Sequence, residues 1–279
     1  MITTDYHTKA NVLTNFNNVQ AVSGLNMQSA EFIRSRLQSL STTQDLYSIG
    51  SNVSADLICN VKLNSLAQDM IIICKGSGTS DEWNIGFDFS GQQFVFRVNN
   101  LAGLGEAFST VTGGLTTGQF YFLRFTFNNI GITGGTSLRI EVNNNQIGSK
   151  TSQLQPIDGS NGFSFGWNNL NTSTYFEGLI DSCGFWRTTS NPSGGAIDSA
   201  IATQIWNNGD PLSYEELTAS IKASLQFWYE FDENQRVKFH SDRPLVETHD
   251  IISMKNDTPK MDTNIQDDES MKIDSLLIK

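Results

Sequence analysis

FEGLIDSCGFWR, residues 176–187, is the stretch of the sequence that decides the fold. Its apolar residues indicate a buried strand, and a polar Gly/Ser loop follows it. The next segment is amphipathic and ends in IWNNG, residues 205–209. Because Ile197, Ile201 and Ile205 recur every four residues, we predict a short helix over 196–206 that is capped at Gly209.

Upstream of this stretch, short segments alternate between apolar and polar side chains. In residues 54–63, period-two alternation directs one set of side chains to a core; this set is Ala55, Leu57, Cys59, Val61 and Leu63. Residues 70–75 and 119–127 are apolar on both faces, which is typical of strands covered on both sides. Regularly spaced short strands between Gly and Asn turns indicate a sandwich or barrel.

Two hairpins are expected within this region. Residues 83–89 alternate, with Trp83, Ile85, Phe87 and Phe89 on one face, and a tight turn at Ser90-Gly91 leads to a second alternating run. Residues 137–142 run into a turn in the Asn143–Asn145 segment. Alternating runs on both sides of such short turns favour antiparallel pairs.

Downstream of residue 209, Ser213 and Glu216 have the spacing of a capping box, which predicts a second helix with Leu217, Ile221 and Leu225 on one stripe. Residues 225–231 then return to strand alternation. The segment 232–279 contains many charges and a single aromatic residue. We expect it to be an arm that is ordered only by docking on its own domain or on a neighbouring subunit.

Composition limits the classes of partner. The 279 residues are 38% hydrophobic and 17% charged, and the formal net charge is −11. This field opposes binding to phosphate backbones, so we expect no nucleic-acid partner. The longest apolar run is too short to cross a bilayer, and residues 1–13 lack the pattern of a signal peptide. The three cysteines lie in apolar, strand-like runs without metal-ligand spacing, and we expect them to be free and buried.

Taken in order, these segments resemble the laminin-G-like, concanavalin A-like lectin/glucanase jelly rolls, in the form found in phage structural proteins. Residues 54–75 resemble the first paired strands of that family, 83–98 its next hairpin, and 119–149 the segment that leads to an Asn-Gly turn, where this chain has Asn144-Asn145. Residues 176–187 and 205–217 resemble the closing strand and helix. The resemblance covers about residues 54–209.

The resemblance implies an all-β fold: a concanavalin A-like jelly-roll β-sandwich with two short C-terminal helices and an extended acidic arm. We expect an N-terminal arm with the first strands at 1–50, the jelly-roll domain at 51–210, and a helix, a strand and the charged arm at 211–279. Residues 213–233 resemble runs that open a further module in phage and marine viral structural proteins. Too few residues follow for a second domain, so this segment either adds a strand to the first domain or exchanges with a neighbour.

Glycan hydrolases of this fold carry an E-x-D-x-x-E or E-x-D-x-E strand motif, because glycoside cleavage needs paired carboxylates. The nearest sequence here is Glu230-Phe231-Asp232-Glu233, followed by Asn and Gln where the final Glu is required. The sequence also lacks a phosphate-binding G-K-[ST] loop. We therefore predict that the chain is not an enzyme.

Asp181 lies in the strand of the deciding stretch, where some relatives hold calcium with acidic loop residues. Calcium requires six or more oxygen ligands, and Asp181 has apolar neighbours and no nearby acids in the sequence. We predict a structural hydrogen-bonding role for Asp181, such as accepting from a turn amide, and no cofactor; calcium is not favoured.

Sugar recognition needs an exposed aromatic plane beside amide or carboxylate groups. Two sequence segments provide such groups next to loops, and their residues are the candidate ligand contacts: Asp81, Glu82, Trp83, Trp167, Asn168 and Asn169. The alternative, which the sequence favours, is that both tryptophans fill the core of the sandwich.

The resemblance implies a non-enzymatic structural or binding protein of a bacteriophage virion, such as a head decoration, fibre or tail-associated adhesion module. Its partners would be other virion proteins or copies of itself, held through the terminal arms, and glycans of the host surface. It would be made in the host cytoplasm and located on the virion, without membrane association. The alternative is a bacterial carbohydrate-binding or adhesion protein, which would normally carry a secretion signal.

Overall fold

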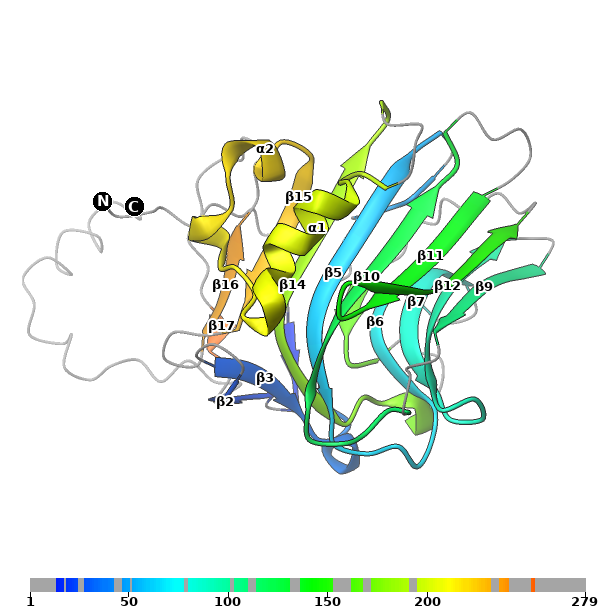
Figure 1. The fold of residues 1–279 in the computed structure, drawn as a ribbon. Helices are drawn as coiled ribbons and strands as arrows, with labels where there is room; N and C mark the ends of the chain where they lie inside the picture. The colour runs from blue at the N-terminus through cyan, green and yellow to red at the C-terminus, as the bar shows by residue number, and fades with distance from the viewer. Residues whose placement is uncertain are drawn as a thin grey trace, which may run out of the picture.

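The computed structural model describes residues 14–17, 19–24, 28–42, 47–50, 52–77, 80–100, 103–109, 114–130, 136–152, 162–167, 172–190, 195–231, 236–240 and 252–253. They form two antiparallel sheets packed face to face, with two short helices on the outside of one sheet (Figure 1). The predicted all-β, concanavalin A-like sandwich is confirmed. Most of the predicted charged arm, and residues 1–13, lie outside the described residues.

The first sheet, sheet A, contains strands from both halves of the chain. Its order is β1 (Thr14–Phe16), β4 (Ser39–Thr42), β13 (Phe163–Phe165), β6 (Met70–Ser77), β7 (Ser80–Asp88), β8 (Gln93–Asn100) and β9 (Gly103–Ser109). Residues 14–42 therefore contribute strands to the sandwich.

The second sheet, sheet B, is wider. Its order is β12 (Asn145–Ser152), β11 (Thr136–Val142), β10 (Phe120–Asn128), β5 (Ser54–Leu63), β14 (Gly178–Thr188), β15 (Leu225–Glu230), β16 (Arg236–His240) and β17 (Ile252–Ser253). The short strands β2 (Gln20–Ser23) and β3 (Gln28–Phe32) join it where β3 pairs with the first residues of β14.

The main core lies between the inner faces of the two sheets. The inward sets predicted for residues 54–63 and 83–87 are buried there, together with Cys59 and Cys183 on the adjacent strands β5 and β14. Aromatic rings fill much of the space, as in the stack of Trp83 on Phe185 with ring centroids 6.0 Å apart. All three cysteines are buried and free, as the sequence predicts.

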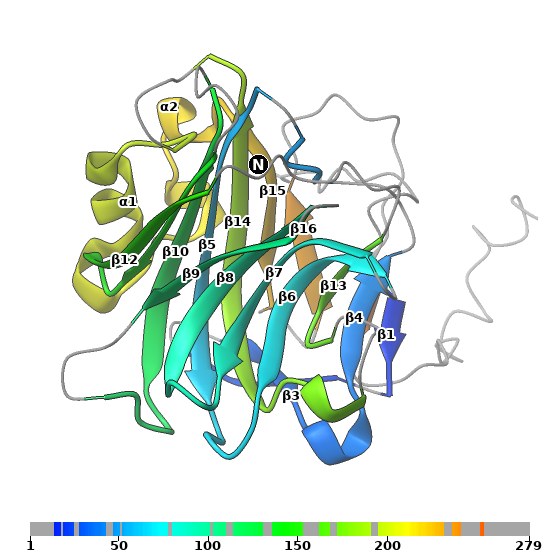
Figure 2. The same cartoon turned by 90° about the vertical axis from the view of Figure 1, so that its right-hand side faces the viewer.

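A second, smaller core covers the outer face of sheet B. It joins helix α1 (Ser199–Trp206) and helix α2 (Ala219–Lys222) to the sheet. Figure 2 shows both helices on the side of sheet B that faces away from sheet A. Because of this cover, β5 is buried on both faces, including Asp56, Ile58 and Asn60, which the alternation predicted as the outward set.

The late helices differ in part from the predictions. Helix α1 begins at Ser199, after Asp198, whose side chain accepts a hydrogen bond from Ile201 N. The predicted capping box of Ser213 and Glu216 is present, but it opens only the 3-10 turn η5 (Tyr214–Glu216). The chain is then extended, and a new cap at Thr218 begins α2. The predicted second helix is therefore present as α2, but it begins after Thr218 and not at the capping box, and the apolar residues of the stripe are buried.

Two turns show how the hairpins close. Asn143 and Asn144 both have positive φ (51° and 60°), and Val142 pairs with Asn145, so the predicted turn is a two-residue type I′ turn. The turn between β7 and β8 spans four residues, 89–92, with Gln92 at φ 49°. The longer loop turns Phe89 outward to 48% exposure, which corrects its predicted place on the inner face.

Strand β15 lies in sheet B beside β14, where Cys183 pairs with Tyr229. Residues 225–230 thus add a strand to the same sheet as the residues of the deciding stretch. The described parts of the predicted arm extend this edge, because β16 pairs with β15 and β17 pairs with β16. Among the described residues, no helix is long and apolar enough to span a membrane.

Candidate functional site

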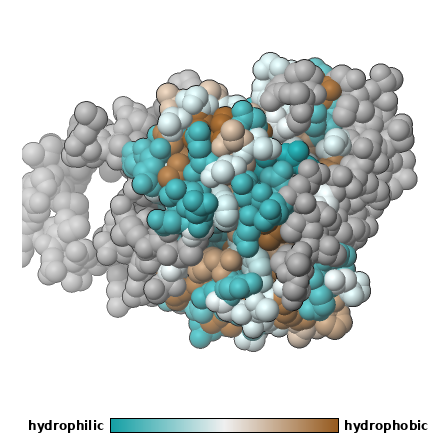
Figure 3. Space-filling model, viewed as in Figure 1, coloured by the Kyte–Doolittle hydropathy of each residue, from teal (hydrophilic) through white to brown (hydrophobic). Residues whose placement is uncertain are grey.

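Within the part of the chain that the structure describes, a groove on the outer face of sheet B is suited to a small ligand. It encloses about 180 Å³ between helix α1 and strands β5 and β10. We call it the outer-face groove and define it by its lining residues: Asn60, Phe120, Phe122, Asn143, Trp206, Gly209 and Pro211. In Figure 3 this side of the molecule is largely hydrophilic, with small hydrophobic areas between.

Three adjacent strands form the floor of the groove. Asn60 on β5 pairs with Phe122 on β10, and directly paired residues of neighbouring strands share a face. Asn143 follows β11 and lies opposite Phe122, because its N–H donates to Phe122 O at 2.8 Å. The Asn143 side chain makes a second hydrogen bond to the same residue, since its Oδ1 accepts from Phe122 N at 3.0 Å. Asn60, Phe122 and Asn143 therefore form one row across the sheet.

The wall of the groove comes from the end of helix α1. Trp206, the last residue of α1, is half-buried and packs against the second core. Beyond it, the 3-10 turn η4 (Asn207–Gly209) reverses the chain with Asn207, Asn208 and Gly209 at positive φ. A Cβ placed on Gly209, whose φ is 97°, would have no atom within 4 Å, so glycine is required there for its backbone conformation.

A buried ion network holds α1 on the sheet. Arg124 on β10 is 1% exposed and donates through Nε to Asp56 Oδ1 at 2.8 Å and through Nη1 to Glu141 Oε2 at 3.2 Å. Its Nη2 donates to Ile197 O at 2.6 Å, just before α1. Burial lowers the pKa of Arg124, but the Asp56 and Glu141 carboxylates raise it above its ordinary value on balance. The guanidinium therefore stays charged and bridges strand and helix.

Asp56 completes this anchor from the other side. Its Oδ2 accepts from Ile197 N at 2.9 Å, and its Oδ1 accepts from Thr126 Oγ1 at 2.7 Å. A Cβ on Gly195 would lie 1.9 Å from Asp56 Oδ2, so only glycine lets the chain pass this close. The position of the groove wall thus depends on charged groups that are far away in the sequence.

The polar groups of the floor are unequally satisfied. Asn60 is 1% exposed, and its Nδ2 donates to Ser182 Oγ at 2.8 Å. Its Oδ1 has no hydrogen-bond partner within the part of the chain that the structure describes. A buried acceptor without a donor costs about 1–3 kcal/mol, so Asn60 Oδ1 is a ready acceptor for a ligand.

The first sequence-predicted candidates, residues 81–83, lie on β7. Trp83 is 2% exposed, and its Nε1 donates to Tyr47 O at 3.1 Å. Glu82 is fully buried and accepts from Ile49 N. Both side chains lie inside the fold, and Trp83 belongs to the main core, which is the alternative that the sequence favoured. The side chain of Asp81 is outside the described residues.

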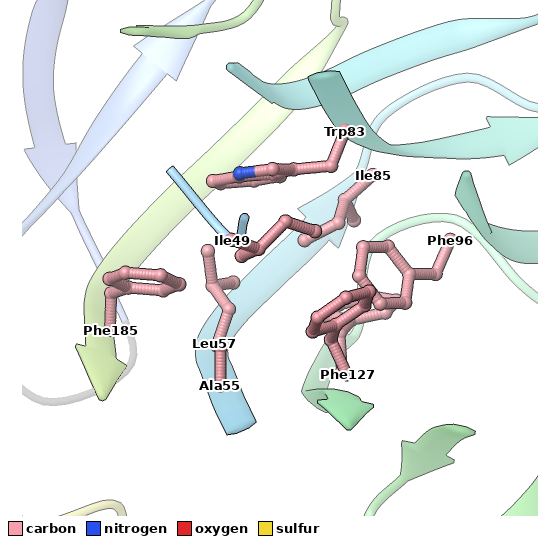
Figure 4. Close-up of a pocket in the computed structure, with 9 residues that line it drawn as sticks. Ile49, Ala55, Leu57, Trp83, Ile85, Phe96, Phe127 and Phe185 are labelled. Carbon is pink, nitrogen blue, oxygen red and sulfur yellow. The ribbon is translucent and has the colours of Figure 1, made fainter. Parts of the chain in front are cut away.

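The cavity beside Trp83 is a packing void of the main core (Figure 4). It measures about 10 Å³ and is lined by apolar side chains, including Trp83, Phe96 and Phe185. A cavity must provide roughly 10–15 Å³ and polar partners to hold even one water. This void is therefore not a ligand site.

The second set of candidates follows β13 of sheet A. Trp167 is half-buried and stacks on Tyr175, with ring centroids 5.1 Å apart and planes 4° from parallel. Its Nε1 is buried without a partner among the described residues. Asn168 and Asn169 lie outside the described residues, so the structure does not bring this set together.

The carboxylates considered for chemistry have structural partners. Asp181 is 6% exposed and accepts from Ser29 Oγ at 2.9 Å, which confirms a hydrogen-bonding role. Glu230 is buried, and its Oε1 accepts from Tyr214 N at 2.6 Å and from Trp228 Nε1 at 3.1 Å. Asp232 and Glu233 lie outside the described residues. Within the described part, no group of three or more potential metal ligands is present.

Sequence reasoning did not identify the outer-face groove. Asn60 and Phe122 belong to strands for which the sequence did not predict the element that packs on the outer face. Trp206 was interpreted only as part of the closing helix. The sequence signal for the groove was the apolar character of residues 119–127 on both faces. Apolar side chains on the outer face of a sheet must be covered by a further layer of structure, which here is helix α1.

Comparisons with known proteins agree with this architecture. Residues 57–193 match a family model described as the concanavalin A-like lectin/glucanases superfamily. No curated protein matches the sequence. The fold is similar to that of the protein HCR/D-Sa-GBL1/C, with 15% identity, a TM-score of 0.52, and coverage of 84% of this chain and 59% of that one.

Two further structures are similar. The binding domain of Paraclostridial Mosquitocidal Protein 1 has 13% identity and a TM-score of 0.50, covering 71% of this chain and 47% of that one. The full-length tailspike protein 2 of the Escherichia coli O157:H7 bacteriophage CAB120 has 13% identity and a TM-score of 0.49, covering 80% of this chain and 30% of that one. The chain thus spans between about a third and three fifths of these proteins. At such identities, the similarity to the first two shows the fold alone.

Proposed function

Because residues 57–193 match the model of the concanavalin A-like lectin/glucanases superfamily, we propose that the chain is a non-enzymatic protein that binds carbohydrate in the outer-face groove. The observation that carries this proposal is the combination of aromatic and amide side chains around one cavity. Trp206, Phe120 and Phe122 line the groove with aromatic rings, and Asn60 and Asn143 line it with side-chain amides.

Sugars have apolar C–H faces and polar edges, so their sites combine aromatic planes with a few placed polar groups. The groove meets both requirements. Its volume of about 180 Å³ is below the roughly 300–1,000 Å³ of sites for drug-sized ligands. We therefore assign it one sugar unit of a longer glycan, with the neighbouring units outside the groove.

The lining supports binding without cleavage. None of the seven described residues that line the groove is acidic, whereas a glycosidase requires two carboxyl groups on either side of the scissile bond. Glu230, the residue closest to a hydrolase motif in the sequence, uses its carboxylate to hold Tyr214 N and Trp228 Nε1. It therefore serves as a structural acceptor beneath the helices.

The proposal is tested by binding of the purified chain to an array of immobilised oligosaccharides. We expect at least one class of glycan to bind, and Trp206→Ala to remove most of that binding. Phe89→Ala is the matched control, because Phe89 is an exposed aromatic residue at the tip of the β7–β8 hairpin, outside the groove lining. The proposal is refuted if no glycan binds, or if Trp206→Ala binds as the unsubstituted chain does while both remain folded.

We retain Trp167, with Asn168 and Asn169, as a second proposed sugar contact. The half-buried Trp167 ring and its Nε1 without a described partner support this choice. Trp167→Ala on the same array would then reduce the binding of a subset of glycans. Unchanged binding would remove this set from the proposal.

The finer assignment, a bacteriophage virion component such as a head decoration, fibre or tail-associated adhesion module, rests on the sequence resemblance. The order of the segments from 54 to 209 and the run at 213–233 support it. Quantitative mass spectrometry of purified virions would detect the chain in stoichiometric amounts. Recovery only as a free, polysaccharide-binding monomer would favour the alternative of a bacterial adhesion or carbohydrate-binding protein.

A further inference from the structure

We propose that the outer-face groove selects sugars that carry an acetamido group, with the amide of that group bound between Asn60 and Asn143. This inference rests on the proposed function and goes beyond it, because it names the chemical group that the groove distinguishes. The ligand class is an oligosaccharide that contains a 2-acetamido sugar.

Asn60 supplies the acceptor. Its Nδ2 is already bound to Ser182 Oγ, which fixes the orientation of the side-chain amide and leaves Oδ1 without a described partner. The side chain is almost completely buried on the floor of the groove. A buried acceptor without a donor is best satisfied by a ligand N–H. Unlike a hydroxyl, an N–H donates without bringing an additional acceptor oxygen into the buried site.

Asn143 supplies the donor. Its Oδ1 is occupied by Phe122 N, and this bond fixes the side chain against β10. The Nδ2 group of Asn143 is then the end that remains for a ligand, and it can only donate. Its natural partner is a carbonyl oxygen. Asn60 and Asn143 together thus present one acceptor and one donor to the same cavity.

The spacing of the two side chains suits a single secondary amide. They lie in one row with Phe122 between them, so their backbones are two inter-strand steps apart, or about 9.6 Å. Two hydrogen bonds of about 2.9 Å and the N-to-O span of an amide, about 2.3 Å, add to about 8 Å. Side chains that lean slightly toward each other can therefore hold the N–H and the C=O of one acetamido group.

The rest of the lining suits the methyl group. Phe122 is 3% exposed and lies between the two amides, and Trp206 and Pro211 close the groove from the helix side. A methyl group on these apolar surfaces gains about 0.8 kcal/mol for each buried carbon, which a sugar hydroxyl cannot. A hydroxyl at the same position would also leave one of the two amide groups without a partner, since it cannot span both.

The experiment compares matched sugars on the full chain. Chitotriose and cellotriose differ only by their acetamido groups, and N-acetylgalactosamine and galactose provide a second matched pair. Affinities are measured by titration calorimetry or by ligand-observed NMR. We expect the acetamido member of at least one pair to bind at least tenfold more tightly, because two additional hydrogen bonds are formed.

Two variants assign the selectivity to the two amides. Asn143→Asp keeps an oxygen for Phe122 N and replaces the donating group, and Asn60→Leu removes the acceptor with little change in size. Each is expected to lower affinity for the acetamido sugar about tenfold, and therefore to reduce the ratio between the two affinities of a matched pair. Asn64→Asp is the matched control, because Asn64 is exposed and is not part of the groove lining. Thermal unfolding establishes whether each variant is folded. If Asn60→Leu does not fold, Asn143→Asp alone decides the test.

The outcomes separate this inference from the function on which it rests. Selectivity that both variants abolish and the control keeps would support the inference. Binding that Trp206→Ala removes, but that is equal for both members of both pairs, would overturn it and leave the proposed function standing. Glycan binding that Trp206→Ala does not change would overturn both.

Discussion

Replacing Arg124 by methionine is the sharpest test of how the second core is held together. The substitution keeps an unbranched side chain of similar reach and removes the guanidinium that contacts Asp56, Glu141 and the carbonyl of Ile197. Two buried carboxylates then lose their shared cation. Breaking a buried pair from one side costs about 3–5 kcal/mol, because an uncompensated charge remains.

The remaining contacts of the two carboxylates indicate a loss of unfolding free energy near the lower limit of that range. Asp56 keeps the hydroxyl of Thr126 and the N–H of Ile197 as donors. Glu141 keeps Arg139, whose Nη2 lies 2.9 Å from Glu141 Oε1. We therefore expect Arg124→Met to lower the free energy of unfolding by about 3 kcal/mol, which corresponds to a fall in Tm of about 6–12 °C for a domain of this size.

The assay is urea unfolding followed by circular dichroism, with hydrogen exchange of residues 195–206 as the local measurement. Arg139→Met is the matched control, because Arg139 binds the same Glu141 but is 25% exposed, and it should cost less than about 1 kcal/mol. We also expect faster exchange in α1 of Arg124→Met alone. If Arg124→Met is no more destabilising than Arg139→Met, the network does not anchor the helix and our reasoning is refuted.

Three further predictions follow from individual contacts. Gly195→Ala should destabilise the fold and loosen the entry to α1, because the new Cβ would lie 1.9 Å from Asp56 Oδ2; an unchanged Tm would contradict this. Hydrogen bonds from the Ser213 backbone and side chain lower the pKa of Glu216 from its ordinary 4.5. The contribution of Glu216 to folding stability is therefore present above about pH 4.5 and is lost as the pH falls through its folded-state pKa. The Tm difference between the unsubstituted chain and Glu216→Ala should accordingly shrink in acid. Burial raises the pKa of the Cys59 thiol, and all three cysteines are buried, so a thiol reagent at pH 8 should react with the native chain only as fast as it unfolds; rapid labelling would contradict the described core.

The sequence predicted the sandwich well because its strands alternate and its turns carry glycine and asparagine. Period-two alternation depends on which side chains face a core, and each strand of the sandwich directs one set of its side chains to the main core. The Asn143-Asn144 turn was also predictable, since asparagine tolerates the positive φ that a type I′ turn requires.

The outer layer was less predictable because its contacts join distant segments. Asp56 and Asn60 appeared to be the polar side of an ordinary half-exposed strand, and only residues 195–222 cover them. Trp83 belongs to the inward set of an alternating run within β7, which favours its burial. Trp167 follows the short strand β13, and no alternating run assigns it to a face.

The place of β15 in the sheet has a practical consequence for anyone who divides this protein into fragments. Residues 57–193, the span that sequence comparison recognises, stop before the strand that pairs with residues 182–186 of β14. A fragment ending there, or at Gly209, would expose an unpaired backbone edge in the middle of sheet B, and without α2 it would also uncover Trp186. Exposed strand edges beside apolar surface are where proteins aggregate. The shortest fragment that can be soluble and folded should therefore continue at least to Phe231, well past the boundary that similarity to relatives would suggest.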